Sequence, residues 1–277
     1  MEKIYTEEQL SKLHSILIMM MNEVKRICDK NNIKYFCMYG TLLGAVRHKG
    51  FIPWDDDFDI AMLRPDYEKF MKVAERDLSE NMFIENYNSC KGYGHVFAKV
   101  MLKGTIWEEG FTEFVDCYKN VYIDVFPLDI TTNNLLKRRI QFFENMLITK
   151  YLLLNCHYKF TKKGIKKVLY NIGYFTAGLI KKETLIKVWE RNAFKYSKCK
   201  NGTYVNFSGV NWSLMKADFF EEELAEMVEV PFEDSRFVIP KGYDSILKKC
   251  YGNYMELPPK EQQVPKHGVV KMDFGDY

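Results

Sequence analysis

The amino-acid sequence predicts an α+β protein, with a mixed β-sheet core flanked by helices and an added helical region. Hydrophobic residues make up 47% and aromatic residues 15% of the 277 residues, which is enough for a sizeable core. Short runs rich in β-branched and aromatic residues alternate with longer segments whose apolar residues recur at helical spacing. Residues 159–200 show a basic, helical pattern, which predicts the added region.

The first predicted helix runs from Glu7 to about Lys30, where apolar residues recur at helical spacing after a capping box of Thr6 and Gln9. Further helices are predicted over residues 42–47, 65–78, 135–154 and 243–250, with two basic amphipathic helices within 159–200. Strands are predicted over residues 33–38, 58–63, 82–87, 94–101, 121–129, 204–207 and 237–240, with an edge strand around 105–107.

We expect three parts in the chain, with a soft boundary near Thr131. Residues 1–130 are expected to form the core domain, and residues 131–200 a basic amphipathic helical insertion. Residues 201–277 form a C-terminal segment that packs back on the core and completes the site.

An acidic cluster, Trp54–Ile60, is the most informative stretch of the sequence. On a strand, Asp57 and Asp59 share one face while the intervening Phe58 points into the core. Two ionised carboxylates this close repel each other, so a hard divalent cation is expected between them. A solvated acidic turn is the alternative, although such turns rarely continue into an apolar strand. A calcium loop of the EF-hand type is disfavoured, because its sixth position needs glycine and is Ile60 here.

A third carboxylate, Asp124, interrupts the apolar run 121–128. An unpaired buried carboxylate is costly, so Asp124 is expected to meet a cation or a hydrogen-bond donor. On a strand beside Asp57 and Asp59 it completes a metal triad. The alternative is a strand cap or an exposed edge position.

Several residues are candidates for holding a phosphate or the substrate. Tyr39, Gly40 and Thr41 join a strand to a helix, where glycine allows close backbone approach and the helix N-terminus favours anions, although Gly–Thr also serves as a simple cap. The other candidates each have an alternative: Arg47 pairs with an acid, Lys99 faces outward from its strand, and His267 is a surface histidine. Trp54 flanks the acids.

Charge and cysteine content limit the partners and the compartment. A net charge of +3 is too balanced for a nucleic-acid binder, so no nucleic acid is expected. The seven cysteines show no metal-ligand spacing and are expected to be reduced thiols in a cytoplasmic protein. We expect no signal peptide and no membrane span. The basic helices are either a solvated face, neutralised by the acidic run at 221–229, or a surface that lies on the inner face of the membrane.

Three blocks of residues resemble the LicD family of the nucleotidyltransferase-fold superfamily, relatives of the fukutin proteins. The blocks occur in the expected order over most of the chain, apart from residues 132–200. Two departures affect the acceptor side: Asn253 stands where an acid is expected, and Lys266–His267 stand where paired histidines or Pro–His are common. The blocks are Tyr39–Arg47 with Ile52–Asp59, Tyr122–Pro127, and Ile239–Gly252 with Leu257–Pro259.

The resemblance implies a nucleotidyltransferase-like core that transfers a phosphoalcohol, such as phosphocholine from CDP-choline, to a hydroxyl of a cell-surface glycan or its lipid-linked precursor. It implies Mg²⁺, or alternatively Mn²⁺, on Asp57 and Asp59. Asp124 then holds a second cation or accepts the acceptor's proton. Alternatives are transfer of another CDP-linked group (glycerol, ribitol or ethanolamine phosphate), nucleotidyl transfer to a small molecule, or a catalytically silent membrane-binding protein.

Overall fold

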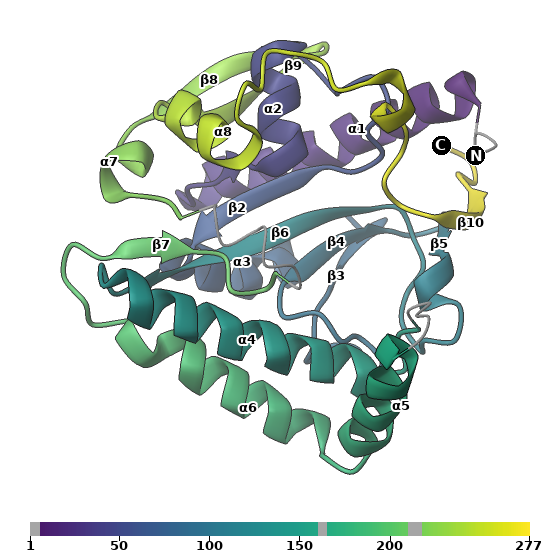
Figure 1. The fold of residues 1–277 in the computed structure, drawn as a ribbon. Coiled ribbons are helices and arrows are strands. Elements are labelled where there is room, and N and C mark those ends of the chain that lie inside the picture. Colours follow the sequence, from purple (N-terminus) through teal and green to yellow (C-terminus); the bar gives the residue numbers. More distant parts are fainter. Residues whose placement is uncertain (1–5, 160–164, 210–217) are drawn as a thin grey trace.

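A six-stranded mixed sheet lies at the centre of the structure, a computed structural model that describes residues 6–159, 165–209 and 218–277 (Figure 1). Strands β2 and β6 are parallel, and the other pairs are antiparallel. The predicted α+β class is confirmed. The strand order is β1 (Phe36–Cys37), β2 (Asp59–Leu63), β6 (Tyr122–Thr131), β4 (Ala98–Leu102) and β3 (Met82–Glu85), and β7 (Thr203–Val205) pairs with the end of β6.

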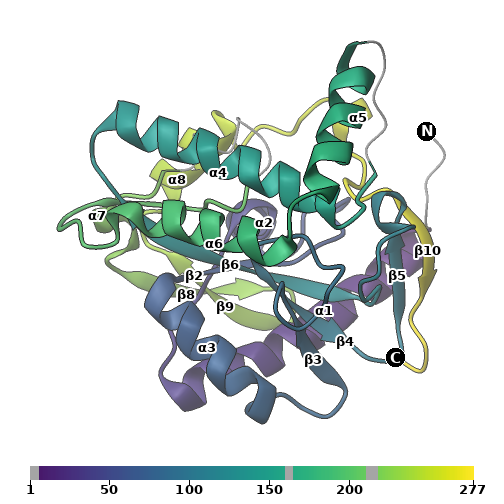
Figure 2. The same ribbon diagram turned by 90° about the horizontal axis from the view of Figure 1, so that it is seen from below.

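Helices cover both faces of this sheet. Figure 2 shows α1 (Glu7–Asn31) and α3 (Arg64–Asp77) on one side and α4 (Leu135–Asn155) and α8 (Tyr243–Tyr251) on the other. The capping box at the start of α1 is confirmed, since Gln9 N donates to Thr6 Oγ1 at 3.1 Å and Thr6 N donates to Gln9 Oε1 at 2.8 Å.

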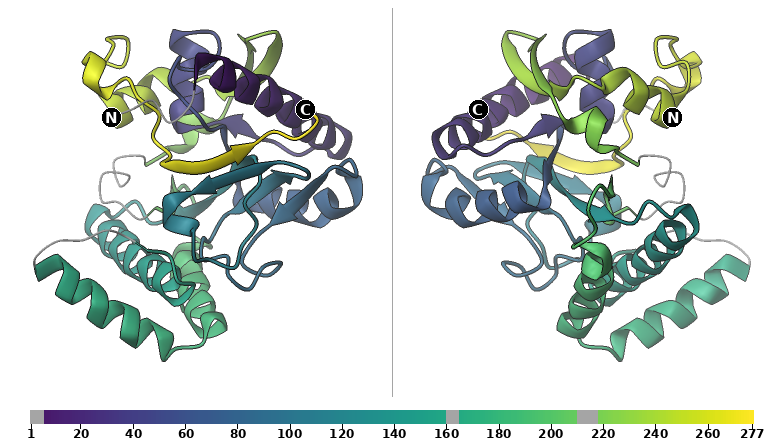
Figure 3. Two further views of the ribbon diagram at one scale, coloured as in Figure 1. Left: turned by 90° about the vertical axis from the view of Figure 1, so that its right-hand side faces the viewer. Right: turned by 90° about the vertical axis from the view of Figure 1, so that its left-hand side faces the viewer.

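The added region consists of α4, α5 (Ile165–Gly178) and α6 (Lys182–Ala193). Helices α4 and α6 pack around buried Phe142, Trp189 and Phe207, whereas α5 lies at the edge of the molecule and extends away from the sheet (Figures 2 and 3). The two expected helices are therefore present.

Among the described residues, the ion pairs formed by the acidic run lie outside this region. Glu223 pairs with Lys249 at 2.6 Å and Glu226 pairs with Lys241 at 2.6 Å, so the interpretation that this run neutralises the basic helices was wrong.

Two small antiparallel sheets hold the C-terminal third in place. Strand β8 (Met227–Phe232) pairs with β9 (Ser235–Pro240), and β10 (Val269–Asp273) pairs with β5 (Ile106–Glu109). The sequence analysis missed β8 and β10, because both carry charged residues at solvent-facing positions. The remaining short elements are α7 (Glu221–Leu224) and 3₁₀ turns at Gly110–Thr112, Phe194–Tyr196 and Lys260–Gln262.

Several predicted boundaries shift in the structure. The strand expected over 33–38 shortens to β1, and the strand expected over 94–101 begins only at Ala98. Helix α2 (Tyr39–Arg47) begins three residues earlier than predicted, with Tyr39 at a φ of 49° where the chain turns from β1 into the helix. Within the described ranges, no helix combines the length and the apolar character needed to cross a membrane.

Candidate active site

Strand register brings Asp59 and Asp124 together. Strands β2 and β6 are parallel neighbours in which Asp59 pairs with Asp124, so the two carboxylates leave the sheet side by side. Thr41 fixes the start of β2, because Asp59 N donates to its buried hydroxyl at 2.8 Å. The convergence of these two acids, expected from sequence, is therefore present.

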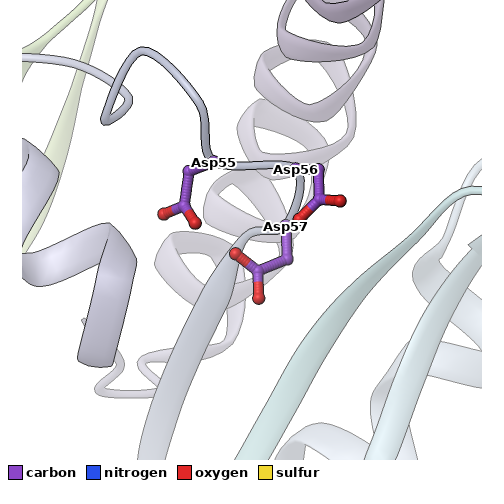
Figure 4. A group of neighbouring side chains, drawn as sticks. All are labelled: Asp55, Asp56 and Asp57. Atoms are coloured by element: carbon purple, nitrogen blue, oxygen red, sulfur yellow. The ribbon is translucent and has the colours of Figure 1, made fainter. Parts of the chain in front are cut away.

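The loop before β2 presents three more carboxylates. Figure 4 shows Asp55, Asp56 and Asp57 leaving one loop, with the Asp57 carboxylate between the other two. One carboxylate oxygen from each of these acids lies within 4.8 Å of the others. The predicted triad of Asp57, Asp59 and Asp124 is less compact than this group, and Asp57 lies before the strand rather than on it.

Asp56 is engaged by the C-terminal segment. Its carboxylate accepts hydrogen bonds from His267 Nδ1 at 2.9 Å and from His267 N at 3.3 Å. The Arg47 guanidinium donates to the carbonyl oxygens of Tyr254 at 2.8 Å and Glu256 at 3.2 Å. Both contacts tie the C-terminal segment to the region of the acids.

Asp55 is positioned by its main chain and by a glycine. Its carbonyl oxygen bonds to His14 Nε2 at 2.8 Å, and the His14 ring stacks on Phe51 with centroids 3.9 Å apart. Its carboxylate lies against Gly40 in the first turn of α2, where an added Cβ would sit 2.6 Å from Asp55 Oδ2. Gly40 is thus the residue that allows the carboxylate to approach the helix terminus.

These acids open into one cavity of about 950 Å³. Asp55, Asp57, Asp59 and Asp124 all line it, together with Tyr39, Gly40, Arg47, Trp54 and His267 from the predicted set. Thr41 and Lys99 are not among the lining residues. The C-terminal segment contributes much of the wall: Tyr251, Asn253, Tyr254, Glu256, Leu257, Pro258, Gln262 and Lys266.

Lys99 neutralises Asp124 and does not face outward. Its Nζ lies 3.2 Å from Asp124 Oδ1, and both side chains are 11% exposed. The strand register pairs the same two residues across β4 and β6, and the ammonium lies 3.0 Å from the centroid of the Tyr122 ring. The predicted contact between Lys99 and a phosphate stays a prediction. Lys99 is paired with Asp124 and is not among the residues that line the cavity.

Burial raises the pKa of the four aspartates that line the cavity. It raises the pKa of Asp55 and Asp59 well above the ordinary range, and the charge of Asp57 adds to both shifts. It raises the pKa of Asp57 to about 6 against the opposing charges of His267 and Lys99. It raises the pKa of Asp124 as well, again opposed by Lys99. The site therefore holds more negative charge than its own cations neutralise.

The positive charge of His267 neutralises part of this negative charge. Burial acts to lower the pKa of His267, but the hydrogen bond to Asp56 and the charges of Asp57 and Glu109 outweigh it and raise the pKa well above its usual value. His267 Nε2 also lies 3.8 Å from Asp57 Oδ2. The ring is therefore a cation between two of the acids.

The donor set fits a hard divalent cation. Carboxylate oxygens are the ligands that Mg²⁺ and Mn²⁺ prefer, and four carboxylates with raised pKa values share one cavity. Burial is the main cause of those raised values, and the positive charge of a bound cation would oppose it by favouring the ionised carboxylates. Asp57 and Asp59, with Asp124 or Asp55, are the residues that would hold it.

An aromatic wall faces the same cavity, and the sequence analysis missed most of it. The Phe97 and Phe126 rings lie 4.6 Å apart between centroids, and Tyr39 meets Phe126 edge-on at 5.6 Å. His95 adjoins Phe97 at 5.0 Å, and burial together with the charge of Lys99 lowers its pKa to about 3, which keeps the ring neutral. The sequence did contain a signal for His95: this histidine follows a glycine and lies just before an apolar strand.

Asn206 was also missed. Its Nδ2 donates to the Tyr39 hydroxyl at 3.0 Å, and its Oδ1 accepts from Ser208 N at 2.9 Å. This places the end of β7 against the start of α2 at the cavity wall. Asn206 lies within the strand predicted over residues 204–207, where a single asparagine gave no distinguishing pattern.

Comparison with known proteins agrees with this geometry. Residues 32–146 match the family model described as LicD/FKTN/FKRP, nucleotidyltransferase domain. The lipopolysaccharide cholinephosphotransferase LicD of Haemophilus influenzae is 26% identical over 96% of this chain and 97% of its own length. Uncharacterized proteins of Rickettsia typhi and Rickettsia prowazekii are 47% and 41% identical over 21% and 27% of this chain, covering 18% and 29% of their own lengths. The matched span contains all four aspartates that line the cavity, and it is this span that resembles the LicD family.

Proposed function

We propose that the protein is a metal-dependent phosphoalcohol transferase that moves phosphocholine from CDP-choline to a hydroxyl of a glycan of the lipopolysaccharide type or its lipid-linked precursor. The observation that carries the proposal is the gathering of Asp55, Asp57, Asp59 and Asp124 in one cavity. Phosphoryl transfer needs neutralised phosphate oxygens and an activated hydroxyl, and this cavity supplies candidate groups for both. The relative that aligns along nearly the whole chain is named a lipopolysaccharide cholinephosphotransferase, which supports the transfer of phosphocholine.

The acids have different roles in the transfer. Mg²⁺ or Mn²⁺ on Asp57 and Asp59 would supply charge neutralisation at the donor pyrophosphate. Asp124 accepts the proton of the acceptor hydroxyl as that oxygen forms its bond to phosphorus, and the bond from phosphorus to the CMP oxygen breaks. Its raised pKa makes Asp124 a stronger base than an exposed aspartate. The products are the phosphocholine ester and CMP.

The start of α2 suits the phosphates of the donor. The first-turn N–H groups of Tyr39, Gly40 and Thr41 have no partner within the helix, and the helix dipole favours an anion there. Arg47, one end of which is held by main-chain carbonyls, adds a fixed positive charge at the cavity wall.

The aromatic wall favours choline among the possible alcohols. A quaternary ammonium group is stabilised by the faces of aromatic rings and has no hydrogen-bond donor to satisfy. Phe97, Phe126 and Tyr39 offer such faces, and neutral His95 adds no repelling charge. Glycerol or ribitol would instead need polar partners for their hydroxyl groups.

We place the reaction in the cytoplasm. All seven cysteines lie within the described residues and are free thiols, as expected in a reducing compartment.

Release of CMP from CDP-choline, measured with Mg²⁺ and an acceptor glycan, tests the proposal. Asp57→Asn and Asp59→Asn are expected to abolish release, whereas Asp234→Asn, an exposed acid in the β8–β9 turn, leaves it unchanged. Because each Asn removes one of several repelling charges, neither site variant should melt below the wild type. Full turnover in Asp57→Asn or Asp59→Asn contradicts the assignment.

A thermal-shift panel identifies the donor. CDP-choline with Mg²⁺ should raise the melting temperature more than CDP-ethanolamine, CDP-glycerol or CDP-ribitol, because a ligand that binds only the folded state stabilises it by mass action. A larger shift with CDP-ribitol would move the proposal to an alditol phosphate. Release of pyrophosphate from CTP in place of CMP would indicate nucleotidyl transfer.

A further inference from the structure

Helix α4 exposes a row of large aliphatic side chains. Leu136, Ile140 and Leu147 lie on one face of the helix at spacings of four and seven residues, and each is at least 42% exposed. The opposite face is the buried one, packed against α6 around Phe142 and Met146. The row therefore faces away from the sheet.

Helix α5, which contacts the C-terminal end of α4, exposes a second row. Val168, Ile172 and Phe175 repeat at spacings of four and three residues and are between 52% and 69% exposed, and Leu179 follows at 73%. Together the two rows form what we call the apolar ridge: Leu136, Ile140, Leu147, Val168, Ile172, Phe175 and Leu179.

Helix α5 packs on the same face of α4 that carries the first row. Tyr151 lies one turn beyond Leu147, and its hydroxyl is hydrogen-bonded to the Thr176 hydroxyl at 3.3 Å. Asn155 Nδ2 donates to Ala177 O at 2.7 Å. The α5 residues that make these contacts are not the ridge residues, so packing leaves the ridge exposed. Figures 2 and 3 show α5 extending from the edge of the molecule.

The charge around the ridge is almost entirely positive. Exposed Lys137, Arg139 and Lys150 lie along α4, and Lys167 and Lys181 lie at the two ends of α5. From residue 132 to residue 182, the sequence contains a single acidic residue, Glu144. This surface combines aliphatic and phenylalanine side chains with a basic rim.

We propose that the apolar ridge docks the protein on an anionic lipid bilayer, with the ridge side chains in the interface and the basic side chains at the lipid phosphates. An interfacial helix has this composition, with Leu, Ile and Phe on one face and Lys or Arg beside it. Anionic lipids attract such basic residues, and the attraction weakens as salt screens it. A protein partner would need a complementary acidic rim, whereas a bilayer of anionic lipids supplies one uniformly.

Docking does not depend on the proposed reaction, and the test separates them. Purified full-length protein is floated with vesicles of phosphatidylglycerol and phosphatidylcholine, or of phosphatidylcholine alone. Binding is expected to the anionic vesicles and to fall by at least about tenfold at high salt. Ile172→Asp/Phe175→Asp and, separately, Lys150→Glu/Lys167→Glu are expected to lower the partition coefficient at least about tenfold.

The matched control is Met19→Asp, which places the same charge at an exposed apolar position of α1 and should float like the wild type. Circular dichroism and melting temperature confirm folding of each variant, and CMP release from CDP-choline in the presence of a water-soluble acceptor should be unchanged in all of them. Undiminished flotation of the ridge variants overturns the proposal. The proposal is also overturned if the wild type does not bind vesicles and light scattering shows that it is a dimer which Ile172→Asp/Phe175→Asp dissociates. The ridge would then join two copies of the chain.

Discussion

Replacing Gly40 with alanine separates the geometry of the acidic cavity from the stability of the fold. The new Cβ would lie 2.6 Å from Asp55 Oδ2, whereas ordinary contact begins at 3.4 Å, so the carboxylate must retreat by about 0.8 Å. The obstacle is the end of a side chain and not main chain, so the backbone of α2 can stay in place. Gly40 does not have a positive φ, and alanine is the better helix former by up to about 1 kcal/mol.

The expected result is a loss of function without a loss of stability. A displacement of this size in a group that positions the reaction can lower the rate by about 10- to 100-fold. We expect kcat/KM for CMP release to fall within this range and Mn²⁺ affinity, measured by titration calorimetry, to weaken. The melting temperature should stay at or above that of the wild type.

Gly178→Ala is the control, because no atom lies within 4 Å of the Cβ position at the end of α5. It should leave both turnover and Mn²⁺ affinity unchanged. Turnover of Gly40→Ala within twofold of the wild type would refute the reasoning about Asp55. A large drop in its melting temperature would show that α2, and not the carboxylate, absorbs the clash.

Three further predictions use other buried charges. Arg64→Ala leaves Asp129 buried without the two hydrogen bonds of 2.7 Å that it now accepts, so urea denaturation should show a loss of about 3–5 kcal/mol. The pKa of His95 is lowered to about 3 in the folded protein, so the unfolded chain binds a proton at this histidine at higher pH than the folded chain does. The free energy of unfolding should therefore decrease as pH falls from 6.5 towards 3, by up to about 1.4 kcal/mol per pH unit. His95→Gln should make the stability less dependent on pH in this range. Since burial raises the pKa of Asp57 to about 6, Mn²⁺ affinity should fall as pH drops below that value.

Each of these outcomes has a result that contradicts it. Wild-type stability in Arg64→Ala would mean that solvent reaches Asp129 freely. A denaturation profile of His95→Gln that parallels the wild type between pH 3 and 6.5 would assign the acid limb to other groups. Mn²⁺ affinity that is constant from pH 5 to 8 would place the cation away from Asp57.

The fold class and most elements were accessible from sequence, because buried strands and amphipathic helices leave periodic patterns. The boundaries of α1, α4 and α8 agree with their predictions to within about two residues. Strands β8 and β10 escaped detection, since a two-stranded pair with a solvated face alternates charged and apolar residues without a continuous apolar run.

For the site, sequence determined the chemistry of the ligands and tertiary structure determined their partners. The acids from Asp55 to Asp59 and the carboxylate of Asp124 stand out by composition alone, because a carboxylate in an apolar run needs a reason to be there. That Lys99 pairs with Asp124 follows from the register of β4 on β6, which no local pattern encodes. That His267 meets Asp56, 211 residues earlier, follows from the path of the C-terminal segment across the cavity. The sequence by itself thus determined which residues carry charge into the core; only the packing of distant segments decided which charges neutralise one another and which remain for a ligand.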